Sequence, residues 1–191
     1  MLVSGDSLIA VALRGGAHIA LRRAHPDDAE DLIEIQRQVV AENVANVDDR
    51  IDTAEECRRR IASTDAGDLW MVAEANGRVV GALRLLSPGP AFLRHIRNLF
   101  IDIHQDWRGQ GLGTALIGAG ADWATANGVE MLALSVLDSN PRARQLYERL
   151  MFVTTGHTPS LVKRRDGSYE NDTQMIRSLH DQGRIIHEQQ Y

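Results

Sequence analysis

The stretch from Ile96 to Leu116 reads I-R-N-L-F-I-D-I-H-Q-D-W-R-G-Q-G-L-G-T-A-L and joins an apolar strand pattern to a glycine-rich turn and a helix start. Gly109, Gly111 and Gly113 lack a Cβ atom, so the backbone there can approach a ligand closely. The following helix start offers about four free N–H groups and roughly half a positive charge. This stretch therefore predicts a site for an anion such as a diphosphate.

Two side chains strengthen the predicted anion site. Arg108 adds a permanent cation just before the glycines, and Thr114 offers a hydroxyl in the first helical turn. The backbone N–H groups that we expect to face the anion belong to Arg108, Gly109, Gln110, Gly111, Leu112, Gly113 and Thr114.

The spacing of the glycines separates three ligand classes. A P-loop is excluded because no lysine follows the glycines. A dinucleotide fold needs a third glycine where Thr114 stands, although Asp138 lies where a ribose-binding acid is expected, so this alternative stays open. The third pattern is R-x-x-G-x-G, carried by Arg108, Gly111 and Gly113. It resembles the acyl-CoA pyrophosphate loop of the GNAT superfamily of N-acyltransferases.

Length and composition indicate a single globular domain. The chain has 191 residues, a net charge of −5 and a pI near 5.8, which favours neither nucleic acid nor an anionic membrane as a partner. Its one cysteine, Cys57, excludes an internal disulfide and is typical of a cytoplasmic protein. The apolar run from Ser7 to Leu13 is too short to span a bilayer, so we expect no membrane segment and no export signal.

Periodicity and turn signals predict a mixed α/β layer with the order β-α-α-β-β-β-α-β-α-β-β. Asn76-Gly77 predicts a tight hairpin, and Thr53 with Glu56 predicts a capping box. The expected strands are His18–Arg23, Leu69–Glu74, Arg78–Leu86, His95–Ile103, Met131–Leu137, Phe152–Gly156 and Thr173–Leu179. One helix is expected over Leu112–Ala126, and the others begin at Pro26, Thr53 and Asn140.

The chain divides into a core domain with two short extensions. We expect residues 1–17 to be an N-terminal extension, residues 18–179 the domain, and residues 180–191 a polar tail. The apolar run Leu8–Leu13 is compatible with an extra strand or with a free end. The acidic connection Glu42–Asp52 is compatible with a solvated loop or with a lip for a cationic substrate.

Further motifs extend the GNAT resemblance over roughly His18 to Leu179. Asn140 and Tyr147 resemble the family's N-x-x-A-x-x-x-Y helix, and the run D-G-S-Y-E-N-D-x-x-M at the end resembles the closing hairpin of a subgroup that acetylates small amines and amino acids. The resemblance implies a GNAT fold, in which a mixed central sheet splays around the cofactor and helices cover both faces. One departure is Met151 before Phe152, where the family commonly has glycine.

The resemblance also implies a reaction and its residues. We expect an acetyl-CoA-dependent N-acetyltransferase that acts on a small amine or amino acid by direct attack in a ternary complex. Backbone groups of Ile101 and Ile103 would hold the pantetheine arm, Asn140 would contact the donor as well as cap a helix, and Tyr147 would protonate the leaving thiolate.

The general base stays open at this point. Asn98 stands near the family's usual position on the central strand and cannot accept a proton. His95, Asp102, His104 and Glu74 are the remaining candidates, and strand alternation puts Asp102 and His104 on one face.

Other chemistries receive less support from the sequence. Cys57 has no paired histidine, which favours a small core residue over an acetyl carrier, and no metal-ligand spacing is present. The rival functions are a catalytically weak acyl-CoA-binding sensor module and a dinucleotide-dependent oxidoreductase. A homodimer through edge strands is compatible with the expected fold.

Overall fold

The computed structural model describes residues 8–42, 50–164 and 166–180. These residues form an eight-stranded sheet with the strand order β1-β2-β3-β4-β5-β6-β8-β7. The strands are β1 (Ile9–Ala12), β2 (His18–Arg23), β3 (Leu69–Ala75), β4 (Arg78–Leu86), β5 (Ile96–Ile103), β6 (Met131–Leu137), β7 (Val153–Lys163) and β8 (Tyr169–Ser178), and the helices are α1 (Ala29–Ala41), α2 (Ala54–Ala62), α3 (Leu112–Ala126) and α4 (Pro141–Arg149).

Local sequence signals place these elements. Thr53 and Glu56 form the capping box at the start of α2, and the Asn76-Gly77 turn has φ values of 53° and 75° between β3 and β4. Both predictions are confirmed, as is α3 with its expected bounds. The chain after Pro26 makes one short 3-10 turn before α1 begins at Ala29.

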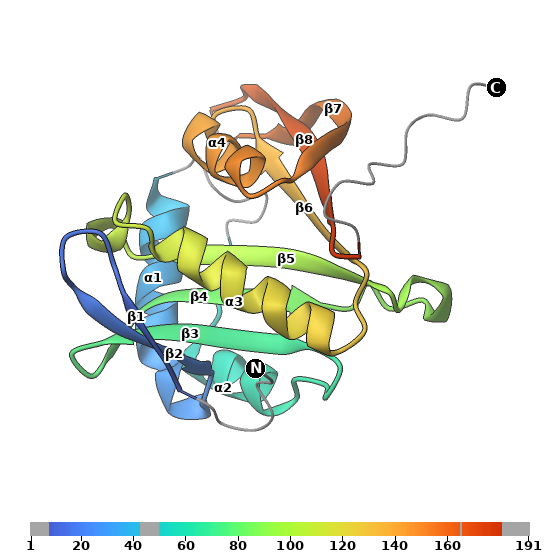
Figure 1. The fold of residues 1–191 in the computed structure, drawn as a ribbon. Coiled ribbons are helices and arrows are strands. Elements are labelled where there is room, and N and C mark those ends of the chain that lie inside the picture. The colour runs from blue at the N-terminus through green and yellow to red at the C-terminus, as the bar shows by residue number, and fades with distance from the viewer. Residues whose placement is uncertain (1–7, 43–49, 165, 181–191) are drawn as a thin grey trace.

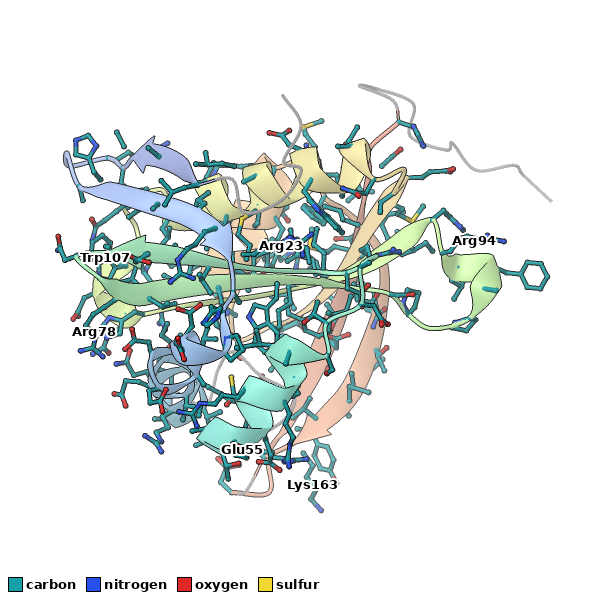
Figure 2. The ribbon with its side chains drawn as sticks, turned by 90° about the horizontal axis from the view of Figure 1, so that it is seen from below. Arg23, Glu55, Arg78, Arg94, Trp107 and Lys163 are labelled. Atoms are coloured by element: carbon teal, nitrogen blue, oxygen red, sulfur yellow. The ribbon has the colours of Figure 1, made fainter. Side chains whose placement is uncertain are left out.

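Helices cover both faces of the sheet (Figure 1). On one face α3 packs its apolar side on the central strands, with Leu116, Ile117 and Trp123 almost fully buried. On the other face α1 and α2 form a second cluster around Ile35 and Val72. Figure 2 shows the same arrangement from below, with Glu55 marking α2 on the face opposite α3. The mixed α/β architecture expected from the sequence is confirmed.

The sheet separates between its two parallel neighbours. Strands β5 and β6 pair only over three residues, where Ile96, Arg97 and Asn98 face Met131, Leu132 and Ala133. From there β5 continues along β4, whereas β6 pairs with β8 along its whole length. The two strands therefore diverge toward the glycine turn, as Figure 1 shows.

The ends of the domain differ in part from expectation. The run Leu8–Leu13 contributes β1, which pairs antiparallel with β2 and so adds an edge strand to the sheet. Strands β7 and β8 are longer than the predicted Phe152–Gly156 and Thr173–Leu179, and the turn at Asp166-Gly167 joins them. Most of the acidic connection Glu42–Asp52, and nearly all of the tail 180–191, lie outside the described residues.

Candidate active site

The glycine turn presents a row of backbone donors at the start of α3. Gly109 and Gly111 have φ values of 80° and 95°, in the left-handed region that glycine tolerates, and Gly111 is the N-cap. Within the described part of the chain, the N–H groups from Gly109 to Thr114 donate to no protein acceptor. With respect to the described residues, six adjacent N–H groups are thus free to bind an anion.

Arg108 does not supply the positive charge at this turn. Its Nε donates to the Ile103 carbonyl at 2.9 Å, and its Nη1 lies 2.6 and 2.8 Å from the two carboxylate oxygens of Glu42. The guanidinium therefore joins the end of β5 to the end of α1, and its charge is balanced there. The backbone N–H of Arg108 donates to the Gln105 carbonyl at 3.3 Å, so the prediction that this N–H group faces the anion is wrong.

Two other arginines lie against the glycine turn. A Cβ atom on Gly109 would lie 2.8 Å from Nη2 of Arg142, and one on Gly111 would lie 3.8 Å from Cγ of Arg14. The Arg14 N–H also donates to the Gln110 carbonyl at 3.0 Å. Both cations come from segments far from the turn in sequence, α4 and the turn after β1, so the sequence motif did not reveal them.

The divergence of β5 and β6 opens a cavity of about 440 Å³, within the usual range for small-molecule sites. Its lining includes the expected residues Ile101 and Tyr147, and the polar residues Arg84, Asn98, Ser135 and Gln174. Ile103 is not part of this lining, since its side chain packs near Gly113 on the α3 side. Side chains from β4, β5, β6, α4 and β8 thus meet in one place.

The direction of the backbone N–H groups of β5 agrees with the roles expected for Ile101 and Ile103. The His104 N–H donates to the Val80 carbonyl of β4 at 3.0 Å. Successive residues of an antiparallel strand point their N–H groups to opposite sides, so Ile103 and Ile101 turn theirs away from β4. Because β6 has already diverged, these N–H groups face the side where the cavity lies.

Tyr147 carries a phenol without a partner in the described chain. Its ring is buried and packs against Phe152 with 5.7 Å between centroids, while no hydrogen bond engages its hydroxyl. Burial raises the pKa of Tyr147 well above its usual value, and the charge of Asp102 adds to the rise. The phenol is therefore protonated at neutral pH and can donate a proton.

Of the four base candidates, only Asp102 lines the cavity. Burial raises the pKa of its carboxyl, against the opposing effects of Arg84 and Arg108. His104 lies in a separate hollow, with its Nε2 2.9 Å from Nε2 of Gln38, and Glu74 is paired with Arg22 at 2.8 Å. His95 precedes β5 at the end of the sheet marked by Arg94 in Figure 2, opposite the end marked by Trp107.

Asn140 and Thr114 lie where their predicted structural roles need them. The Asn140 side chain accepts a hydrogen bond from the Ala143 N–H at 3.1 Å, which confirms the cap of α4. Thr114 is exposed in the first turn of α3, and Leu112 buries its side chain in the core, leaving its N–H on the loop. Contacts of these residues with a donor molecule stay predictions.

The structure offers little support for an acetyl-carrier cysteine or for a dinucleotide site. Cys57 is buried, and burial raises its pKa to about 11, so the thiolate needed for an acetyl carrier is scarce at neutral pH. Asp138, the acid of the dinucleotide alternative, accepts hydrogen bonds from Asn171 and Thr173 at 3.1 and 3.0 Å. Among the described residues no His, Cys, Asp and Glu side chains form a metal-binding group, and none of the helices is long and apolar enough to cross a membrane.

Comparison with known proteins agrees with this geometry. The model of the acetyltransferase (GNAT) family matches residues 36–152. An acetyltransferase of Pectobacterium atrosepticum is 31% identical over 87 residues, which are 46% of this chain and 59% of that relative, so the match spans less than two thirds of the relative's length.

Solved structures show the same architecture. A GNAT-family acetyltransferase from Streptococcus pneumoniae matches with a TM-score of 0.76 and 28% identity, over 84% of this chain and 99% of that one. A phosphinothricin acetyltransferase of the GNAT superfamily from Sinorhizobium meliloti, solved in complex with acetyl-CoA, matches with a TM-score of 0.78 and 22% identity, over 84% and 88% of the two chains. The splayed mixed sheet expected from the sequence is confirmed.

Proposed function

The chain belongs to the acetyltransferase (GNAT) family, and from this membership we propose that it transfers the acetyl group of acetyl-CoA to the amino group of a small amine or amino acid. The observation that carries the proposal is that the anion site at the start of α3 and the cavity lined by Tyr147 lie at the same diverging end of the sheet. Six N–H groups at the start of α3 lie at the end of the sheet toward which β5 and β6 diverge, and the phenol of Tyr147 lines the cavity between these strands; none of these groups has a hydrogen-bond partner among the described residues.

The donor fits these features by its chemistry. The diphosphate of acetyl-CoA would bind the N–H groups from Gly109 to Thr114, with the guanidinium of Arg142 as a nearby cation. The pantetheine arm is an extended amide chain and would pair with the free edge of β5 at Ile101 and Ile103. The structural relative from Sinorhizobium meliloti, solved with acetyl-CoA, supports this choice of donor.

The proposed reaction is a direct transfer of the acetyl group from the thioester of acetyl-CoA to the amine. Asp102 accepts a proton from the acceptor's ammonium group, directly or through water, and the freed amine attacks the thioester carbon. The oxygen of that carbon gains negative charge, which a backbone N–H of β5 would stabilise. The C–S bond then breaks, Tyr147 gives its proton to the departing thiolate, and the nitrogen loses its second proton to solvent to give the neutral amide. Proton return from solvent to Tyr147 and proton loss from Asp102 complete the cycle.

A titration followed by an assay tests the proposal. Acetyl-CoA should bind the purified protein calorimetrically with a Kd of ~1 µM, about −8 kcal/mol, whereas NAD as the control ligand should give no heat. Release of free CoA thiol should then depend on an added amine. Binding of acetyl-CoA without acetylation across a broad amine panel would favour the sensor module instead, and binding of NAD alone would remove the acetyltransferase assignment.

The homodimer through the edge strands β1 and β7 stays a prediction.

A further inference from the structure

Arg84 is a charged residue in an otherwise apolar strand. It lies on β4 in the run V-V-G-A-L-R-L-L, and its side chain lines the cavity between β5 and β6. Its guanidinium carbon lies 5.4 Å from the ring centroid of Trp70 and 5.2 Å from that of Phe100. The two aromatic rings hold the cation in place and cover part of it, so its side chain is only 20% exposed.

The guanidinium N–H groups of Arg84 donate no hydrogen bond to any of the described residues. Its nearest carboxylate oxygen, on Asp102, is 3.8 Å away, which is too long for a hydrogen bond. Arg97, on the neighbouring strand, shows what a structural arginine looks like in this fold, since it donates four hydrogen bonds to the carbonyls of Gly67, Arg94 and Ile96. A partly buried guanidinium without such bonds is costly for stability, and a ligand that supplies acceptors would remove that cost.

The surroundings of Arg84 define the charge of that ligand. Arg84 and Asp102 are the only charged residues in the described lining of the cavity. Gln174 already donates its amide to Thr158 and Asp172, and Asn98 is neutral. Arg60, a second cation over Trp70 at 5.7 Å, is paired with Asp52 and lies outside the cavity. The cavity therefore offers one cation and one anion side by side.

We propose that Arg84 binds the carboxylate of the acceptor, so that the acceptor is a free amino acid and not a simple amine. This inference rests on the proposed function, because it assigns the acceptor of the same reaction. An α-amino acid carries its ammonium and carboxylate groups on one carbon atom, so both can meet an oppositely charged pair at close spacing. A planar guanidinium binds a carboxylate through two parallel hydrogen bonds, and the amine is then left beside Asp102.

Matched substrate pairs test the inference in the unmodified protein. Each L-amino acid of a panel is compared with the amine that lacks only its α-carboxylate, such as leucine with 3-methylbutylamine and phenylalanine with 2-phenylethylamine. We expect kcat/KM for the best amino acid to exceed that of its partner amine by about 10- to 100-fold, the range for a hydrogen-bonded charge. Amines that are acetylated as well as their amino acids would overturn the inference while leaving acetyl transfer intact.

Variants then locate the preference on Arg84. Arg84→Met should lower kcat/KM for the amino acid by about 10- to 100-fold more than kcat/KM for the partner amine, and Arg84→Lys should restore part of the preference. Arg60→Met, the matched control, should keep the ratio of the wild type. Equal losses for both substrates in Arg84→Met would mean a structural role and would overturn the inference. A protein that binds acetyl-CoA but acetylates neither series overturns the inference together with the proposed transfer, whereas failure to bind acetyl-CoA removes the proposed function itself.

Discussion

At the scale of single residues, Tyr147 combines structural support with a free functional group. Its ring contributes to the core through Phe152, whereas its hydroxyl has no partner among the described residues. Tyr147→Phe should therefore keep the fold and the affinity for acetyl-CoA, and should lower kcat about 100-fold if chemistry limits turnover. Single-turnover kinetics and calorimetry measure the two effects. An unchanged rate of the chemical step would remove Tyr147 from the mechanism.

Asp102 predicts a distinct pH profile. Burial holds the pKa of its carboxyl above the ordinary value, and the carboxyl can act as the proposed base only after this proton is lost. We expect kcat/KM to rise with pH through this raised pKa, and Asp102→Asn to lose that ascending limb together with about 100-fold of the rate. Asp106→Asn, which changes an exposed carboxylate, serves as the control and should retain the limb. An Asp102→Asn enzyme with the wild-type profile would assign the base elsewhere.

The same shift has a consequence for stability. A carboxyl whose pKa is raised by folding binds its proton more tightly in the folded state, so its contribution is fully present below the ordinary pKa and is lost as pH rises through the raised folded pKa. Asp102→Asn should therefore be more stable than the wild type at neutral pH and equally stable in acid. Thermal unfolding at both pH values measures this difference, and a variant less stable at neutral pH would contradict the expected sign.

The sequence motifs located those site residues that come from one continuous segment. The glycine turn and Tyr147 follow fixed spacings, so the chain alone could indicate them. Arg14 and Arg142 reach the turn only because β1 pairs with β2 and α4 packs beside α3, and no local spacing records that contact. Arg84 did leave a signal, a charge within an apolar strand, but its meaning depends on the divergence of β5 and β6.

At the scale of elements, the start of α3 depends on the backbone of Gly111. Its φ of 95° is strained for any residue with a Cβ atom, so Gly111→Ala should lower the free energy of unfolding by about 1–2 kcal/mol and weaken acetyl-CoA binding. Gly118, in the middle of the same helix, has no atom within 4 Å of a Cβ position, so Gly118→Ala should raise stability by about 0.5–1 kcal/mol and leave binding unchanged. Denaturant unfolding and calorimetry compare the two variants. Equal effects would show that the turn's backbone does not matter.

The elements predicted best are those with strong periodicity or a fixed turn type. α3 and the hairpin of β3 and β4 meet these conditions, and their bounds from sequence agree with the structure to within a residue. Strand β7 has neither strong periodicity nor a fixed turn type, because most of its residues are exposed at the edge of the sheet and its pairing with β8 shifts register twice. Burial on one face produces the alternation that a sequence shows, and an exposed edge strand such as β7 has little of it.

At the scale of the whole molecule, the cavity lies between two parts of one sheet. β5 and β6 share only three residue pairs, and the core beneath them, which includes Leu116 of α3 and Met175 of β8, spans both parts. A donor molecule in the cavity would contact both β5 and β6 beyond their pairing, where the described residues form no hydrogen bonds between the two strands. Binding should therefore stabilise the fold as a unit.

Acetyl-CoA at 100 times its Kd should raise the free energy of unfolding by about 2.7 kcal/mol, which for a chain of this size corresponds to a rise in Tm of roughly 5–10 °C. Hydrogen exchange should slow in two places at once, at the N–H groups from Gly109 to Thr114 and along the diverging parts of β5 and β6. Tyr147→Phe should show the full stabilisation because its hydroxyl acts on the chemical step, whereas Gly111→Ala should show less. Protection confined to the turn would place the donor outside the cavity and would separate the anion site from the proposed reaction centre.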